Sequence, residues 1–139
     1  MMGKDFELLN HTADVGIVAY GENLSQAFSN AAKGLFSLIT ELDSVREVVS
    51  RDIALGSPDK ESLLVEWLNE LIYLFDTEYL LFKRFEVTIL GDHELKARCY
   101  GEKVDSSRHS LKTAVKATTY HMLSVAKDNG YKAQVIFDI

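Results

Sequence analysis

The residues of this chain that are best suited to chemistry are acidic, and they lie near its two ends. Asp14 falls in the short polar turn His11-Thr-Ala-Asp-Val-Gly16, which interrupts two apolar, strand-like runs. Asp138 ends another apolar run, residues 135–139, and is followed by the terminal carboxylate of Ile139. We expect the two ends to meet. Three converging carboxylates can share a site at neutral pH only if a cation or a proton joins them.

A cation held by these groups would be bound through oxygen alone. Such ligands favour a hard divalent ion, Mg²⁺, Mn²⁺ or Ca²⁺, over zinc. The acids also have purely structural interpretations: Asp14 as a turn residue that caps its own backbone, and Asp138 as a solvated chain end. His11 could be a further ligand, but a hydrogen-bonded structural histidine fits better, because a zinc site would need two more soft or imidazole ligands.

Three other side chains have one functional and one structural interpretation. His109 lies in the basic stretch 103–110 and could contact a phosphate, whereas an ordinary loop residue is the simpler interpretation. Glu70 could contact a partner or simply be solvated. Cys99 is the single cysteine, which excludes an internal disulfide. We expect it to be a small buried residue on the apolar face of a strand, because it lies in an alternating segment. A catalytic thiol is the alternative, but no nearby histidine is placed to activate it.

The composition indicates one domain that spans residues 1–139. A chain of 139 residues with 47% hydrophobic content can bury most of its apolar surface in a single core. No run approaches the roughly 18 apolar residues that a membrane helix needs, and residues 1–5 lack the pattern of a secretory signal. We therefore expect a cytoplasmic protein that has no membrane partner.

The charge of the chain limits its direct use of nucleic acid. The net charge is −6, whereas binding to a phosphate backbone depends mostly on lysine and arginine. The charge is uneven along the sequence: residues 59–78 contain six acids and one base, and residues 96–116 contain six bases and two acids. Two differently solvated faces explain this pattern as well as a patch that steers an anionic or protein partner.

Two long amphipathic helices and one short helix are predicted. Asn23 and Gln26 have the spacing of a capping box, after which apolar residues recur at helical spacing. Ser57 is a suitable cap for the second helix, with Pro58 in its first position. The predicted helices cover residues 24–40, 58–79 and 111–118.

Alternation of apolar and polar residues predicts the strands. Gly91-Asp92-His93 and Asp128-Asn129-Gly130 are turn signals that would each join a hairpin. The predicted strands cover residues 4–10, 15–21, 45–55, 85–90, 94–102, 120–127 and 131–138. The order β-β-α-β-α-β-β-α-β-β indicates an α+β domain, in which mostly antiparallel sheet packs against the two long helices.

Several short segments form a set that follows a fixed order along the chain. They are His11-Thr-Ala-Asp-Val-Gly16, Ala19-Tyr-Gly21, Leu24-Ser-Gln-Ala-Phe28, Leu63-Leu-Val-Glu-Trp-Leu-Asn-Glu-Leu71, Gly101-Glu102, Val115-Lys-Ala-Thr-Thr-Tyr-His121 and Val135-Ile-Phe-Asp-Ile139. Each is weak by itself. Together, in a chain of this length, they resemble the archease family, and the resemblance covers essentially the whole chain.

This resemblance implies a non-enzymatic accessory protein of an RtcB-type RNA ligase. That ligase joins tRNA halves during tRNA splicing with GTP and a divalent metal, and archeases promote its guanylylation and repeated turnover. GTP and RNA would then act through the partner ligase. In the family, two aspartates with the carboxy terminus bind a metal, and one lysine is also needed. These positions correspond here to Asp14, Asp138 with Ile139, and Lys116.

Two departures from the family pattern and two other functions are also considered. Asn10 and Ala114 stand where relatives often carry an acid, so they would weaken the metal site or change the partner contacts. An older suggestion describes archeases as chaperones for tRNA-modifying enzymes. The acids could also serve a metal-dependent phosphoester hydrolase, although no Ser/His/Asp set or second metal cluster supports one.

Overall fold

The computed structural model describes residues 4–10 and 14–139. Both long helices and every predicted strand have a counterpart in it, which confirms the α+β class. The elements are β1 (Phe6–Asn10), β2 (Asp14–Gly21), α1 (Leu24–Ile39), the 3-10 helix η1 (Leu42–Ser44), β3 (Val49–Gly56), α2 (Lys60–Glu78), β4 (Leu80–Leu90), β5 (Glu94–Lys103), β6 (Ala117–Thr118), β7 (Ser124–Lys127) and β8 (Tyr131–Asp138).

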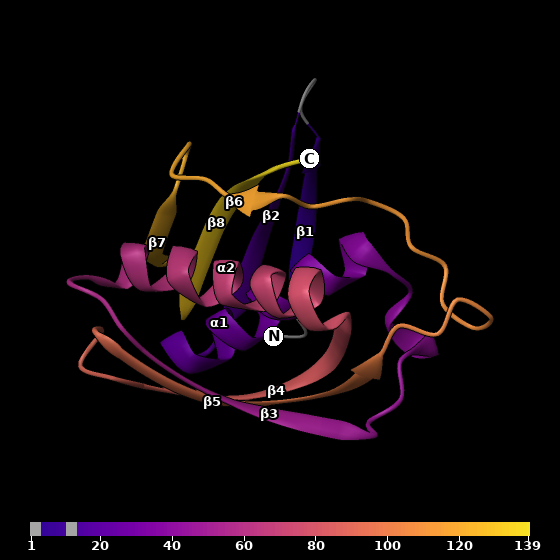
Figure 1. Ribbon diagram of the computed structural model, residues 1–139. Helices are drawn as coiled ribbons and strands as arrows, with labels where there is room; N and C mark the ends of the chain where they lie inside the picture. The colour runs from indigo at the N-terminus through magenta and orange to yellow at the C-terminus, as the bar shows by residue number, and fades with distance from the viewer. Residues whose placement is uncertain (1–3, 11–13) are drawn as a thin grey trace.

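The strands form two antiparallel sheets, and the helices lie between them (Figure 1). Sheet A has the order β1-β2-β8-β6, and β7 also pairs with β8; sheet B has the order β3-β5-β4. Helix α1 contacts β2 of sheet A and β4 of sheet B, while α2 packs against β6 and against all three strands of sheet B. Each sheet therefore has one face toward the helices and one outer face.

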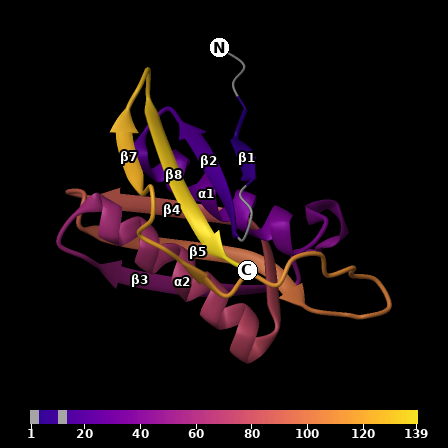
Figure 2. The ribbon, with the colours of Figure 1, turned by 90° about the horizontal axis from the view of Figure 1, so that it is seen from above.

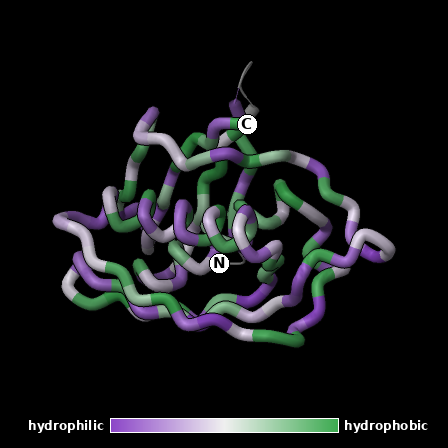
Figure 3. Tube along the Cα trace, in the orientation of Figure 1, coloured by the Kyte–Doolittle hydropathy of each residue, from purple (hydrophilic) through white to green (hydrophobic). Residues whose placement is uncertain are grey.

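The hydrophobic core fills the space between the sheets. Leu95, Ala97 and Cys99 alternate along β5 with exposed polar residues, so the two kinds lie on opposite faces. In Figure 3, which has the orientation of Figure 1, the tube alternates between hydrophobic and hydrophilic colours along the strands of sheet B. Burial raises the pKa of the Cys99 thiol to about 12, which confirms its structural interpretation. The indole N–H of the fully buried Trp67 on α2 donates to the carbonyl of Phe28 on α1 (3.0 Å) and ties the helices together.

Helix α2 begins two residues later than the sequence predicts. Its cap is Asp59, whose carboxylate accepts a hydrogen bond from the backbone N–H of Ser62 (2.8 Å). Ser57 does not cap the helix, because its hydroxyl donates to the carboxylate of Glu66; its backbone N–H donates to the carbonyl of His93 in the β4–β5 turn (2.8 Å). No helix in the described part of the chain has the length and apolar character to cross a membrane.

The predicted short helix over residues 111–118 is wrong. This segment is extended and ends in β6, because its backbone N–H groups bond to other elements and not to one another. Lys112 donates to the carbonyl of Ile39 at the end of α1 (2.8 Å), and Lys116 donates to that of Asp138 in β8 (2.8 Å). The segment therefore crosses from α1 to the edge of sheet A.

Three strand boundaries also differ from the prediction. Tyr79, with φ of 57°, ends α2 and lets β4 follow at once. Met122, with φ of 54°, breaks the alternation before β7. Before β3, the chain forms η1 and the buried Val45 instead of a strand. The strands lie at residues 49–56, 80–90 and 124–127, where the sequence predicts 45–55, 85–90 and 120–127.

Candidate functional site

The two ends of the chain meet, as the apolar runs predicted. Strand β2 pairs with β8, and Figure 2 shows them side by side. In the register of this pair, Asp14 lies directly opposite Asp138. Directly opposite residues of an antiparallel pair have Cβ atoms about 4.5–5.5 Å apart. The two carboxylates are therefore neighbours at one end of sheet A.

The carboxylates lie on the outer face of the sheet. Ile17 of β2 and Val135 of β8 are fully buried in the core between the sheets. Asp14 and Asp138 are each an odd number of positions away from these residues, so their side chains are on the other face. Asp14 is half-buried and Asp138 is exposed. The pair is thus partly enclosed by the protein and partly accessible from outside.

Gly16 allows β2 and β8 to approach each other closely beside the pair. A Cβ atom at this position would lie 2.5 Å from Cδ1 of Ile136 and 2.7 Å from the carbonyl oxygen of Val135. Gly16 ends the polar turn of the sequence and also falls in the strand predicted over residues 15–21; the structure places it inside β2. Its lack of a side chain serves strand packing next to the carboxylates.

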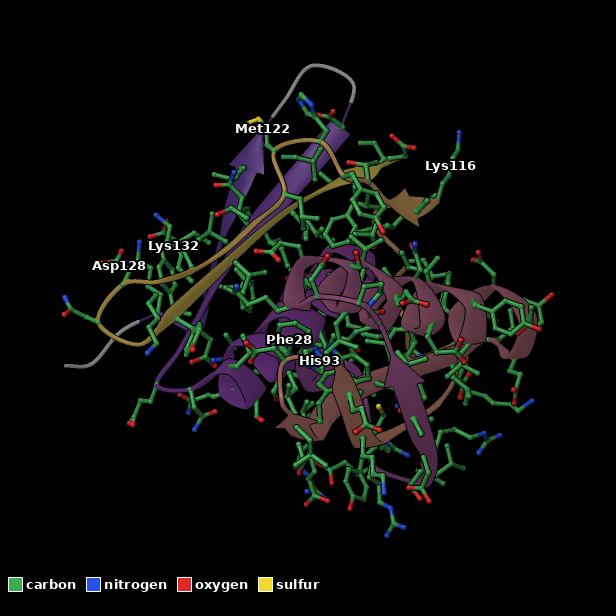
Figure 4. All side chains as sticks on the ribbon, turned by 90° about the vertical axis from the view of Figure 1, so that its left-hand side faces the viewer. Phe28, His93, Lys116, Met122, Asp128 and Lys132 are labelled. Atoms are coloured by element: carbon green, nitrogen blue, oxygen red, sulfur yellow. The ribbon has the colours of Figure 1, made fainter. Side chains whose placement is uncertain are left out.

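Lys116 reaches the site through its backbone. Its N–H donates to the carbonyl of Asp138 (2.8 Å), and the following residue, Ala117, is the register partner of Asp138. Its side chain is exposed and extends away from the ribbon (Figure 4). The structure therefore brings Asp14, Asp138 and Lys116 together, with the ammonium group directed outward.

Asn69 on α2 also belongs to this region, and the sequence prediction missed it. Its side-chain oxygen accepts a hydrogen bond from the backbone N–H of Thr118 in β6 (2.7 Å). The available signal was an asparagine within the mostly apolar, family-like segment 63–71. Glu70, the predicted partner contact, is half-buried beside it on α2. The predicted candidate His11 lies outside the described residues.

His109 lies inside the protein, and not on the surface where a phosphate could reach it. Its side chain has no exposed area, and its Nδ1 accepts a hydrogen bond from the N–H of Asp105 (2.8 Å). The proton of the neutral imidazole is therefore on Nε2, which lies 3.0 Å from the Glu102 carboxylate. Burial favours a higher pKa for Glu102, but hydrogen bonds from Arg108, the Arg46 backbone and His109 hold it below its usual value.

The donor set of the carboxylate pair fits a hard divalent ion. Among the residues that the structure describes, no group of three or more His, Cys, Asp or Glu side chains could hold a metal ion. Asp14 and Asp138 would supply two ligands, and the carboxylate of Ile139 would supply a third. A hard ion such as Mg²⁺ takes few protein oxygens and keeps several waters. A cation between the two acids would also remove the repulsion of like charges directly opposite each other.

Comparison with known proteins identifies the family of this chain. Residues 6–139 match the sequence model of the Archease protein family (MTH1598/TM1083). The chain belongs to the archease family. An archease of Methanosarcina mazei is 42% identical over 142 aligned positions, which cover 99% of this chain and 97% of the relative. An archease of Saccharolobus islandicus is 44% identical, over 98% of this chain and 99% of the relative.

Solved structures agree with the archease fold. The solution structure of Methanobacterium thermoautotrophicum protein 1598 is 37% identical to this chain, with a TM-score of 0.86, and covers 97% of this chain and 99% of its own. A crystal structure of an archease from Thermotoga maritima, described as a possible chaperone, has a TM-score of 0.64 over 94% of both chains. At 20% identity it shows the shared fold alone.

Proposed function

We propose that this archease is a non-enzymatic activator of a GTP-dependent RNA ligase of the RtcB type in tRNA splicing. It would promote guanylylation of the ligase and repeated turnover. The observation that carries the proposal is the direct pairing of Asp14 with Asp138, with Lys116 hydrogen-bonded to Asp138. These are the acids and the lysine that the family resemblance assigns to metal binding and activation. The two acids share an outer face, and the backbone of the lysine adjoins Asp138.

The acids would hold Mg²⁺, Mn²⁺ or Ca²⁺ at the end of sheet A. Asp14 is well placed for this role, because β2 pairs with β8 from Asp14 onward and with β1 from the next residue, Val15, onward. Asp138 is exposed and can face a partner, with Ile139 beside it. When bound, a hard cation supplies positive charge that can bind phosphate oxygens, here those of GTP on the ligase.

Lys116 would supply a second positive charge next to the acids. Its ammonium group is exposed, and its backbone is fixed to β8. A lysine acts as a mobile point charge, so it can meet a phosphate or a carboxylate of the partner without a fixed geometry. RNA would be bound by the ligase, which is consistent with the net charge of −6 on this chain.

The test is the amount of covalent GMP on the ligase. An RtcB-type ligase is incubated with GTP, Mg²⁺ and limiting amounts of this protein, and we expect a marked rise in guanylylated ligase. Asp138→Asn and Lys116→Ala should each lose the stimulation while remaining folded. Asp92→Asn, in the exposed β4–β5 turn, is the matched control and should stimulate like the wild type. No rise with the wild-type protein would refute the proposal.

A chaperone is the second candidate, because the Thermotoga maritima relative is described as a possible chaperone. A chaperone that binds unfolded clients through its surface has no need of the carboxylate pair. Asp14→Ala would then suppress the aggregation of a client enzyme as well as the wild type does, whereas the activator proposal predicts loss of ligase stimulation. A hydrolase, the remaining alternative, would turn over phosphoester substrates without any ligase.

A further inference from the structure

The strand that carries Lys116 to the site is very short. β6 contains only Ala117 and Thr118, and residues 104–116 before it and 119–123 after it have no regular secondary structure. Lys116 donates to the carbonyl of Asp138 (2.8 Å), and Thr119 donates to that of Ile136 (2.9 Å). A two-residue strand with so few ladder bonds opens easily unless other groups hold it.

Helix α2 provides such a group. Between the two bonds to β8, the backbone N–H of Thr118 donates to the side-chain oxygen of Asn69 (2.7 Å). Asn69 is well placed to hold β6 still, because its neighbours Trp67, Leu68 and Leu71 are fully buried and fix the helix in the core. A long-range bond between a rigid helix and a short edge strand therefore lies next to the carboxylate pair.

Asn69 is an unusual residue for this position. Asparagine lowers helix stability relative to leucine in a helix interior, and most of the surrounding positions of α2 are apolar. Thr118 is only 6% exposed, so water cannot replace the Asn69 oxygen as the hydrogen-bond acceptor of its N–H group. A buried N–H without a partner is costly, which makes the closed position of β6 depend on Asn69.

We propose that Asn69 is a positioning residue of the site: its side-chain oxygen holds β6 against β8 and so places Lys116 beside Asp138. The inference rests on the proposed function for the role of Lys116. The placement of β6 is nevertheless a property of the protein alone and can be measured without the ligase.

The experiment compares Asn69→Leu, which removes the acceptor, with Asn69→Asp, which retains an acceptor oxygen. Asp76→Leu, an exposed position of the same helix, is the matched control. Amide hydrogen exchange is measured at Lys116, Thr118 and Thr119, together with stimulation of ligase guanylylation. In Asn69→Leu we expect exchange at these amides to rise about tenfold, the effect of one lost hydrogen bond of ordinary strength. Stimulation should fall in parallel.

Asn69→Asp and Asp76→Leu should exchange and stimulate like the wild type, since both keep the acceptor bond. Wild-type behaviour of Asn69→Asp would show that the acceptor oxygen positions β6. A loss of packing is a poor explanation for the effect of Asn69→Leu, because leucine is the substitution that reduces packing least. Unchanged exchange in Asn69→Leu, or equal defects in Asn69→Leu and Asn69→Asp, would overturn the inference. If the exchange results are as expected but the wild-type protein does not stimulate the ligase, the proposed function fails and only the placement of β6 by Asn69 stands.

Discussion

Two pairs of directly opposite residues, one in each sheet, differ in charge: one pair joins an acid to a base, and the other joins two acids. In sheet B, Asp52 on β3 lies directly opposite Arg98 on β5, and the guanidinium Nε donates to the carboxylate (2.7 Å). In sheet A, Asp14 lies directly opposite Asp138. Opposite charges at such positions stabilise a sheet, and like charges destabilise it. The acidic pair therefore reduces stability by itself, which is common at sites that bind a ligand.

The outer faces of the two sheets also differ in how their charged side chains are arranged. On sheet B, Arg84 forms ion pairs with Glu47 and Glu86 (2.9 Å each), and its guanidinium lies over the ring of Tyr100 (3.7 Å). Charges that are paired within the protein offer little to a partner. At the end of sheet A, Asp138 and the Lys116 side chain are both exposed. The contrast favours the end of sheet A as the side that meets a partner.

The largest expected effect comes from breaking the close approach of β2 and β8. In Gly16→Ala, the new Cβ would overlap Ile136 and the Val135 carbonyl, so the strands must separate. We expect a loss of about 3 kcal/mol in the free energy of unfolding, typical of overpacking against backbone. Urea denaturation measures this loss.

The matched control is the glycine at the end of β3 in sheet B. A Cβ at Gly56 would meet only the His93 carbonyl, at 3.8 Å, so Gly56→Ala should leave the free energy of unfolding nearly unchanged. Equal effects of Gly16→Ala and Gly56→Ala would show that the two strand ends are packed alike.

The next largest effect is that of metal on the acidic pair. A divalent ion that binds only the folded protein stabilises it by about 2.7 kcal/mol at 100 times its dissociation constant. Thermal melting with added Mg²⁺, Mn²⁺ or Ca²⁺ should therefore raise the melting temperature of the wild-type protein. Asp138→Asn should lose this response and should be slightly more stable without metal, because one of two like charges is gone. The same increase in both proteins would place metal binding elsewhere.

The elements were predictable where local pattern and capping agree. Asn23 accepts from the Gln26 N–H (2.8 Å) as the capping-box spacing predicts, and α1 follows over 24–39. The segment 111–118 failed because its helix-like spacing is overruled by long-range backbone bonds to α1 and β8, which no local window contains. Ser57 failed as a cap because a competing carboxylate, Asp59, stands two residues further on.

The carboxylate pair was predictable for a simple reason. Asp14 and Asp138 each adjoin an apolar run, and such runs at the two ends of a small domain can pair as strands. The roles of Asn69 and His109 could not be predicted, because they depend on which backbone or side-chain groups from other parts of the chain these residues contact. His109 lies in a hydrophilic stretch, and its position inside the protein depends on two partners, the buried carboxylate of Glu102 and the backbone N–H of Asp105.

A smaller effect should come from Glu102, which holds the segment after β5. Glu102→Gln keeps the shape but removes the charge that Arg108 and His109 bind, and we expect a loss of about 2 kcal/mol in the free energy of unfolding. The pKa of Glu102 is lower in the folded protein, so its contribution is complete above the ordinary value near 4.5 and is lost as the pH falls through the folded value. Glu102→Gln should lack this part of the acid destabilisation.

The smallest effect is expected at the opposite-charge pair of sheet B. Asp52 and Arg98 are exposed, so Asp52→Asn should lower the melting temperature less than Glu102→Gln does, and the difference should shrink in high salt. The arginine holds the pKa of Asp52 below its usual value, so the difference should also disappear at acid pH. The response to metal should match that of the wild type, because the acidic pair is intact. A lost metal response in Asp52→Asn would mean that the outer faces of the two sheets are not independent, and the contrast between them would no longer identify the site.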